Sequence, residues 1–139
     1  MRRLNDFHTV VVVDDDPSVL WALWRSLRQE PYQILTTDRP EEALDWVRHR
    51  PVSLVISDQR MPEMEGTDLL EEVAKDSPAT ARVILTAYPE STALLPGLRK
   101  RIDCLVTKPW DVTLLRRTIR DILNDLELEQ KSEEDERGP

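Results

Sequence analysis

The sequence is poor in the residues that stabilise small secreted domains or bind metal clusters. Its 139 residues include one cysteine, three glycines and one phenylalanine. A single cysteine, Cys104, excludes an internal disulfide and a cysteine-based metal cluster, and it fits a reducing cytosol. No apolar run approaches the roughly 20 residues of a membrane span, and the first residues lack a signal peptide's apolar stretch. We therefore expect a cytoplasmic protein with no membrane association.

Positive charge is also scarce. The 19 Lys and Arg residues face 27 Asp and Glu residues, which gives a net charge of −8. This balance argues against a broad surface for nucleic acid, so we expect no direct nucleic-acid partner. The length fits one domain that buries about two-thirds of the surface of the unfolded chain. We assign residues 1–127 to that domain and residues 128–139 to an acidic tail or linker, which we expect to be disordered because it has few apolar residues.

Five apolar segments alternate with helix-like stretches. The expected strands lie near residues 9–13, 32–36, 52–57, 82–86 and 103–107. Alternation of this kind is typical of βαβ units with a parallel sheet, and continuous apolar runs indicate central strands covered on both faces. The sequence therefore predicts an α/β fold with a parallel sheet. The form we expect is a flavodoxin-like doubly wound (βα)5 three-layer sandwich with parallel strand order 2-1-3-4-5.

The sequence signals for the expected helices differ in strength. Asp16 and Pro17 form a clear start signal, because the carboxylate caps the first turn and proline suits the first helical position. Helices are also expected over residues 40–50 and 66–76 and from Asp111 onward. The remaining helix, over residues 91–101, contains Pro96-Gly97, and proline inside a helix costs about 3 kcal/mol. We expect that helix to be short or kinked.

Charged and hydroxyl side chains stand where the expected strands end. In an open doubly wound sheet, ligands bind beyond the carboxyl ends of the strands, where the winding reverses. That point collects Asp14, Asp15 and Asp58, with Thr86 and Lys108 nearby. Two carboxylates about 4 Å apart repel by roughly 4 kcal/mol at an effective dielectric of 20, so a cation must offset them. Oxygen-only ligands favour Mg²⁺, which uses one or two carboxylates plus phosphate oxygens.

Four fragments of the sequence carry a family resemblance. They are Val13-Asp14-Asp15-Asp16-Pro17, Asp58 with Met61-Pro62 and Gly66, Leu85-Thr86-Ala87, and Thr107-Lys108-Pro109. Together, in this order and at this spacing, they resemble the receiver domain of two-component response regulators. The resemblance covers about residues 7 to 127.

The resemblance implies a metal-dependent phosphoacceptor. Asp58 would take a phosphoryl group from a sensor histidine kinase or a phosphotransfer protein. Mg²⁺ would be held by Asp15, Asp58 and the backbone carbonyl of Arg60, with Asp14 acting through a metal-bound water.

The remaining implied roles concern the phosphoryl group and the output. Thr86 and Lys108 would contact the phosphoryl oxygens, and the Lys108-Pro109 peptide would be cis. The only chemistry implied is self-phosphorylation and self-dephosphorylation, so the protein would not otherwise be an enzyme. An effector domain or partner protein and a homodimer are implied as possible outputs.

Three features depart from the family or add to it. Receivers commonly carry Tyr or Phe three residues before the lysine, where this chain has Leu105. Arg60 and Tyr88 occupy positions that tune phosphoryl lifetime in the family, and we expect their bulk to hinder the attacking water. Trp21 and Trp24 lie on the helix that many receivers offer to their kinase, which makes them a hypothetical docking pair.

Two other functions fit part of the pattern. A phosphatase of the haloacid dehalogenase superfamily would use Asp14 as nucleophile and Asp16 as acid and base, with Thr86 and Lys108 in support. That alternative leaves the segment from Asp58 to Gly66 unexplained. A receiver-like module that docks partners without phosphorylation is the other alternative, and the complete acidic set argues against it.

Overall fold

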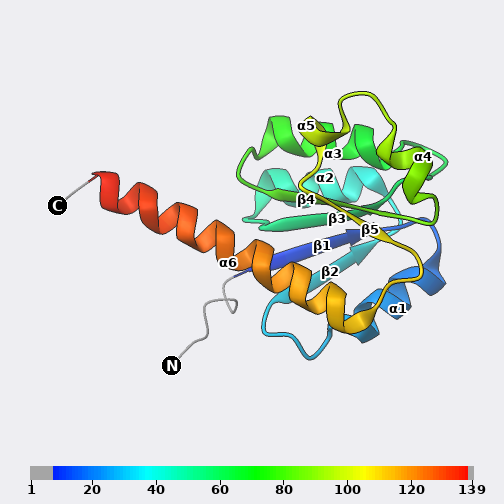
Figure 1. The fold of residues 1–139 in the computed structure, drawn as a ribbon, viewed down its shortest axis with the longest axis horizontal. Helices are drawn as coiled ribbons and strands as arrows, with labels where there is room; N and C mark the ends of the chain where they lie inside the picture. Colours follow the sequence, from blue (N-terminus) through cyan, green and yellow to red (C-terminus); the bar gives the residue numbers. More distant parts are fainter. Residues whose placement is uncertain (1–7, 138–139) are drawn as a thin grey trace.

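The computed structural model describes residues 8–137, and it describes side chains as far as residue 133. Five parallel strands form one sheet (Figure 1), and their order is β2-β1-β3-β4-β5. The strands are β1 (Thr9–Val13), β2 (Gln33–Thr37), β3 (Leu54–Asp58), β4 (Ala81–Thr86) and β5 (Cys104–Thr107). The predicted fold class and strand order are confirmed.

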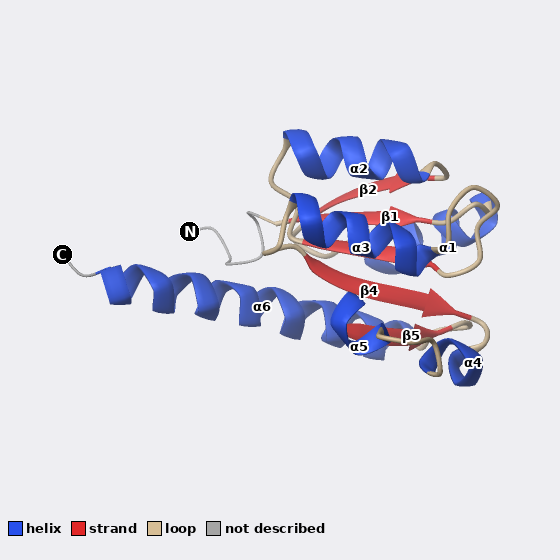
Figure 2. Ribbon diagram, turned by 90° about the horizontal axis from the view of Figure 1, so that it is seen from above, coloured by secondary structure: helices blue, strands red, loops and turns tan. Residues whose placement is uncertain are grey.

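Helices cover both faces of the sheet. They are α1 (Pro17–Leu27), α2 (Pro40–His49), α3 (Gly66–Asp76), α4 (Pro89–Ala93), α5 (Leu98–Arg101) and α6 (Val112–Arg137). Figures 1 and 2 show α1 and α6 on one face, and α2 and α3 on the other. Successive strand residues point to opposite faces, so the valine run of β1 serves both cores. Val10 and Val12 pack toward α1 and α6, and Val11 and Val13 pack toward α2 and α3.

The predicted weak helix is divided in two. Its first part is the five-residue α4 and its second part is the four-residue α5. Pro96 lies between them, and Gly97 has a φ of 69°, a left-handed conformation that glycine adopts without the strain of a Cβ. Proline and glycine therefore end one helix and begin another, as the sequence indicates.

The end of the chain differs from expectation. The sequence predicts disorder over residues 128–139, but α6 continues as a helix to Arg137 and projects past the sheet (Figure 2). Residues 138 and 139 lie outside the described part. The error arose from composition, since a helix anchored by packing at its first turns can continue through residues that lack apolar partners. The boundary between domain and tail stays a prediction.

Polar contacts fix α6 against the rest of the domain. Arg120 donates two hydrogen bonds to Glu30, of 2.7 and 2.8 Å. Further along the helix, Glu127 lies 2.7 Å from His8, just before β1. None of the helices between residues 8 and 137 is long and apolar enough to cross a membrane.

Candidate functional site

The carboxyl ends of four strands deliver the site. Asp14 directly follows β1, Asp58 is the last residue of β3, and Thr86 is the last residue of β4. Lys108 follows β5 in the same way. Because β1 pairs with β2 on one side and β3 on the other, Asp14 and Asp58 stand where the winding direction reverses.

Lys108 joins the two buried carboxylates. Its Nζ donates to Asp14 Oδ2 at 2.8 Å and to Asp58 Oδ1 at 3.0 Å. Burial raises the pKa of Asp14, although hydrogen bonds from Lys108 and from the Asp16 amide act in the opposite direction. Burial would lower the pKa of Lys108, but the bonds to Asp14 and Asp58 outweigh it and raise the pKa. The ammonium therefore stays charged and offsets the repulsion between the acids.

The acidic cluster fits a divalent cation. Asp14, Asp15 and Asp58 each offer a carboxylate oxygen, and these oxygens lie within 4.8 Å of one another. Asp14 is buried, with 1% of its surface exposed, whereas Asp15 is exposed. An oxygen-only donor set that is partly open to water suits Mg²⁺, which keeps several of its waters.

Asp16 has a different task from its two neighbours. Its carboxylate accepts hydrogen bonds from the Ser18 amide at 2.9 Å and from the Ser18 hydroxyl at 2.7 Å. These bonds cap α1, with Pro17 at the first helical position. The predicted role of Asp16 as a helix cap is confirmed.

Thr86 is held by its backbone and by its side chain. Its carbonyl accepts a 2.7 Å hydrogen bond from the Lys108 amide, which ties the end of β4 to the residue after β5. Its hydroxyl accepts from the Tyr88 amide at 2.9 Å and lies 3.0 Å from the hydroxyl of Thr92 in α4. The role of Thr92 could not be predicted from the sequence, because a threonine in a short helix carries no local signal of a tertiary partner.

The backbone behind Asp58 is also fixed by residues that the sequence analysis did not single out for this role. The Gln59 carboxamide accepts from the Thr67 amide at 3.0 Å, which satisfies a free N–H group in the first turn of α3. The Gly66 amide donates to the Gln59 carbonyl at 2.9 Å. A Cβ at Gly66 would stand 2.2 Å from the Asp58 carbonyl oxygen, so only glycine allows α3 to begin this close to the end of β3.

Arg60 and Tyr88 meet at the edge of the site. The Arg60 guanidinium lies 4.2 Å from the centre of the Tyr88 ring, which is a cation–π contact. The two residues follow Asp58 and Thr86 by two positions each, so the pair joins the loop after β3 to the loop after β4. The sequence indicated the importance of these residues but gave no sign that they contact each other.

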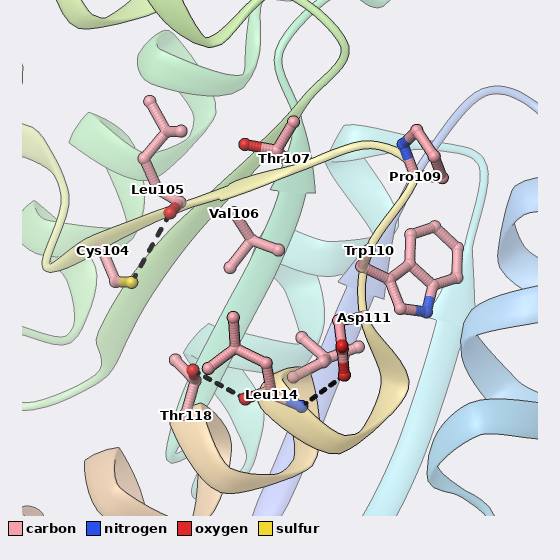
Figure 3. Close-up of a pocket in the computed structure, with 10 residues that line it drawn as sticks. Cys104, Leu105, Val106, Thr107, Pro109, Trp110, Asp111, Leu114 and Thr118 are labelled. Carbon is pink, nitrogen blue, oxygen red and sulfur yellow. Dashed lines mark hydrogen bonds between the residues drawn. The ribbon is translucent and has the colours of Figure 1, made fainter.

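A groove of about 430 Å³ lies beside the site, between β5 and α6 (Figure 3). Trp110 and the exposed Leu114 line it, together with the residues of β5. Figure 3 shows Leu105 and Val106 pointing to opposite sides of the strand, with Val106 toward α6. The peptide bond between Lys108 and Pro109 is cis, as the family resemblance implies.

The two tryptophans of α1 form a stack on the surface. Their ring centres are 5.3 Å apart with an interplanar angle of 17°. Arg28 lies 5.7 Å from the centre of the Trp24 ring, and Trp21 is 59% exposed. The sequence analysis left open whether the pair is exposed or packed against neighbouring side chains, and the structure leaves Trp21 open to solvent.

Comparison with known proteins agrees with the geometry. A family model described as the response regulator receiver domain matches residues 10–120. The hydrogenase transcriptional regulatory protein HoxA of Cupriavidus necator is 34% identical over 81% of the chain, and the transcriptional regulatory protein GlrR of Escherichia coli is 35% identical over 82%. The chain spans 23% and 26% of the lengths of these two relatives, so it matches one part of each.

A solved structure resembles the whole sandwich. The response regulator protein TrrA of Thermotoga maritima, in complex with Mg²⁺ and BeF, superposes with a TM-score of 0.75 at 28% identity. The match covers 84% of this chain and 99% of that one. In that relative, the same fold was therefore crystallised in complex with Mg²⁺ and BeF.

Proposed function

Because the chain belongs to the response regulator receiver domain family, we propose that Asp58 accepts a phosphoryl group in a Mg²⁺-dependent reaction. One observation carries this proposal above the others: Lys108 donates to both Asp58 and Asp14 in the buried end of the sheet. A cation in contact with the accepting carboxylate is what a transferring phosphoryl group requires, since its oxygens carry the negative charge.

The chemistry at Asp58 follows from the residues around it. A carboxylate oxygen of Asp58 forms a bond to phosphorus while the bond from phosphorus to the donor breaks, which yields an aspartyl phosphate. Lys108 would then contact a phosphoryl oxygen, and the Thr86 hydroxyl would contact another. Apart from removal of this phosphoryl group by water, we propose no further catalysis.

The metal site is part of the proposal. Asp15, Asp58 and the Arg60 carbonyl would hold Mg²⁺ directly, and Asp14 would act through a water. When bound, the cation would neutralise charge on the phosphoryl oxygens. The cluster of carboxylate oxygens within 4.8 Å supports this ligand set.

The test is labelling with acetyl phosphate, a small phosphoryl donor. We expect one equivalent per chain, labile to strong acid and to base, in the presence of Mg²⁺, and none with EDTA or in Asp58→Asn. Asp16→Asn is the matched control, because it removes a nearby carboxylate but retains a side chain that caps α1 well. Equal labelling of wild type and Asp58→Asn would refute Asp58 as the acceptor.

The same experiment separates the two alternatives. A phosphatase with Asp14 as nucleophile would release phosphate continuously from p-nitrophenyl phosphate and would lose this activity in Asp14→Asn. A docking module that works without phosphate would show neither labelling nor a Mg²⁺-dependent response to beryllofluoride.

Partners and location extend the proposal. We propose a sensor histidine kinase or a phosphotransfer protein as the donor, and a cytoplasmic location where such donors act. The relatives are transcriptional regulatory proteins about four times as long as the matched segment, which supports an effector domain or partner protein as the output. The projecting end of α6 provides a route to such a partner or to a homodimer.

A further inference from the structure

The hydroxyl of Thr86 is already engaged before any phosphoryl group arrives. It accepts a hydrogen bond from the Tyr88 amide and shares another with the Thr92 hydroxyl, at 2.9 and 3.0 Å. Thr86 and Thr92 are 2% and 4% exposed, so water does not compete for these bonds. Within the described residues, the Thr86 hydroxyl has no hydrogen bond to the carboxylates or the ammonium of the site.

The Thr92 hydroxyl depends on this contact. A threonine in a helix often donates to the carbonyl four residues before it, as Thr118 does to Leu114. Thr92 instead has the Thr86 hydroxyl as its hydrogen-bond partner among the residues described. A buried hydroxyl without a hydrogen-bond partner destabilises the folded protein. Movement of the Thr86 hydroxyl away from Thr92 would therefore destabilise α4.

The local structure allows α4 to move independently of α5. It has five residues, and Pro96 and Gly97 separate it from α5. On β5, Leu105 is an apolar side chain that cannot exchange hydrogen bonds with Thr86. Thr92 is therefore the side chain best placed to sense a movement of the Thr86 hydroxyl.

We propose that Thr92 is a positioning residue that retains the Thr86 hydroxyl in the unphosphorylated protein and releases it to the phosphoryl oxygen. In this proposal Thr86 is the donor of the hydroxyl pair. A hydroxyl has one proton to donate, so a bond from Thr86 to a phosphoryl oxygen replaces its bond to Thr92. The Thr92 hydroxyl then loses its partner, and the first turn of α4 loosens. This inference rests on the function proposed for Asp58 and Thr86.

Affinity for beryllofluoride tests the proposal, measured by isothermal titration calorimetry with Mg²⁺. Thr92→Val removes the hydroxyl at nearly constant shape, so we expect about five-fold tighter binding, the net contribution of one neutral hydrogen bond. Thr92→Ser keeps the hydroxyl and should bind as the wild type does. In a Thr86→Ala background, Thr92→Val should no longer change the affinity.

Ser91→Ala is the matched control on the same helix. Its hydroxyl is exposed and donates to the Tyr88 carbonyl, so its loss should leave the affinity unchanged. A purely structural role for Thr92 would lower the melting temperature of Thr92→Val without tightening binding, and that result would overturn the proposal. Wild-type protein that binds no beryllofluoride would instead refute the function of the site itself.

A second measurement needs no substitution. Amide hydrogen exchange by NMR follows the Thr92 N–H, which bonds the Tyr88 carbonyl at 3.0 Å in the first turn of α4. We expect this amide to exchange about five-fold faster when beryllofluoride is bound, because α4 loses one hydrogen bond. Unchanged or slower exchange at saturating beryllofluoride would refute the release of α4.

Discussion

Gly66 should be irreplaceable because of the space it leaves for the backbone of Asp58. An alanine Cβ there would lie 2.2 Å from the Asp58 carbonyl oxygen and 2.9 Å from Ile84 Cδ1. Ordinary contacts of carbon atoms are optimal at about 3.5 Å, so the overlap with the carbonyl exceeds about 1 Å. A backbone carbonyl cannot escape by changing rotamer, so either the end of β3 or the start of α3 must move.

The expected cost is large for one methyl group. Overpacking costs up to about 3 kcal/mol, which corresponds to a drop of about 10 °C in the melting temperature for a domain of this size. Because the displaced carbonyl belongs to Asp58, we also expect Gly66→Ala to weaken beryllofluoride binding by at least about ten-fold, which is about 1.4 kcal/mol. Circular dichroism and calorimetry measure the two effects separately.

Gly97→Ala is the matched control. A Cβ there meets nothing within 4 Å, but its φ of 69° strains any L-residue. We expect a loss of about 1 kcal/mol with unchanged beryllofluoride binding, since the strain is local. The reasoning about Gly66 is refuted if Gly66→Ala melts and binds beryllofluoride as the wild type does, or if both variants lose binding equally.

Three further predictions concern the site and its access. Lys108→Met should reduce acetyl phosphate labelling at least about ten-fold, because a phosphoryl oxyanion loses its cationic partner. It should also tighten Mg²⁺ binding, measured by calorimetry. Unchanged labelling would contradict the role of the ammonium. The double variant Arg60→Asn, Tyr88→Ala should shorten the lifetime of phosphorylated Asp58, because the cation–π pair no longer restricts the access of water to the phosphoryl group. Phos-tag electrophoresis measures this lifetime, and an equal or longer lifetime would argue against the prediction. Trp24→Ala should slow phosphotransfer from a phosphorylated histidine phosphotransfer domain but leave acetyl phosphate labelling unchanged, and equal slowing of both would indicate a structural role instead.

The sequence predicted the parts of the fold that depend on local pattern. Alternating apolar runs indicated the five strands, and Asp16 with Pro17 located the start of α1. The break between α4 and α5 followed from Pro96 and Gly97, since both residues act on the backbone where they stand. The end of α6 was predicted wrongly, because composition favoured disorder where the helix continues to Arg137.

The residue types at the strand ends were also readable from the sequence, because parallel strands in a doubly wound sheet must gather their carboxyl ends at one edge. The sequence alone therefore predicts that Asp14, Asp58 and Lys108 lie together. The resemblance to the receiver family then implied separate roles for Asp14, Asp15 and Asp58, and the helix cap predicted at Asp16 is confirmed.

Only the tertiary structure decided which side chains meet. The bond between Thr86 and Thr92, the contact of Arg60 with Tyr88, and the close approach of Gly66 to Asp58 join loops whose relative positions depend on packing. Periodicity fixes the face on which a residue lies, whereas such contacts depend on distances of a few tenths of an ångström between separate elements. The sequence therefore determined which functional groups gather at the strand ends, and the packing of α3 and α4 against those ends decided how these groups are positioned.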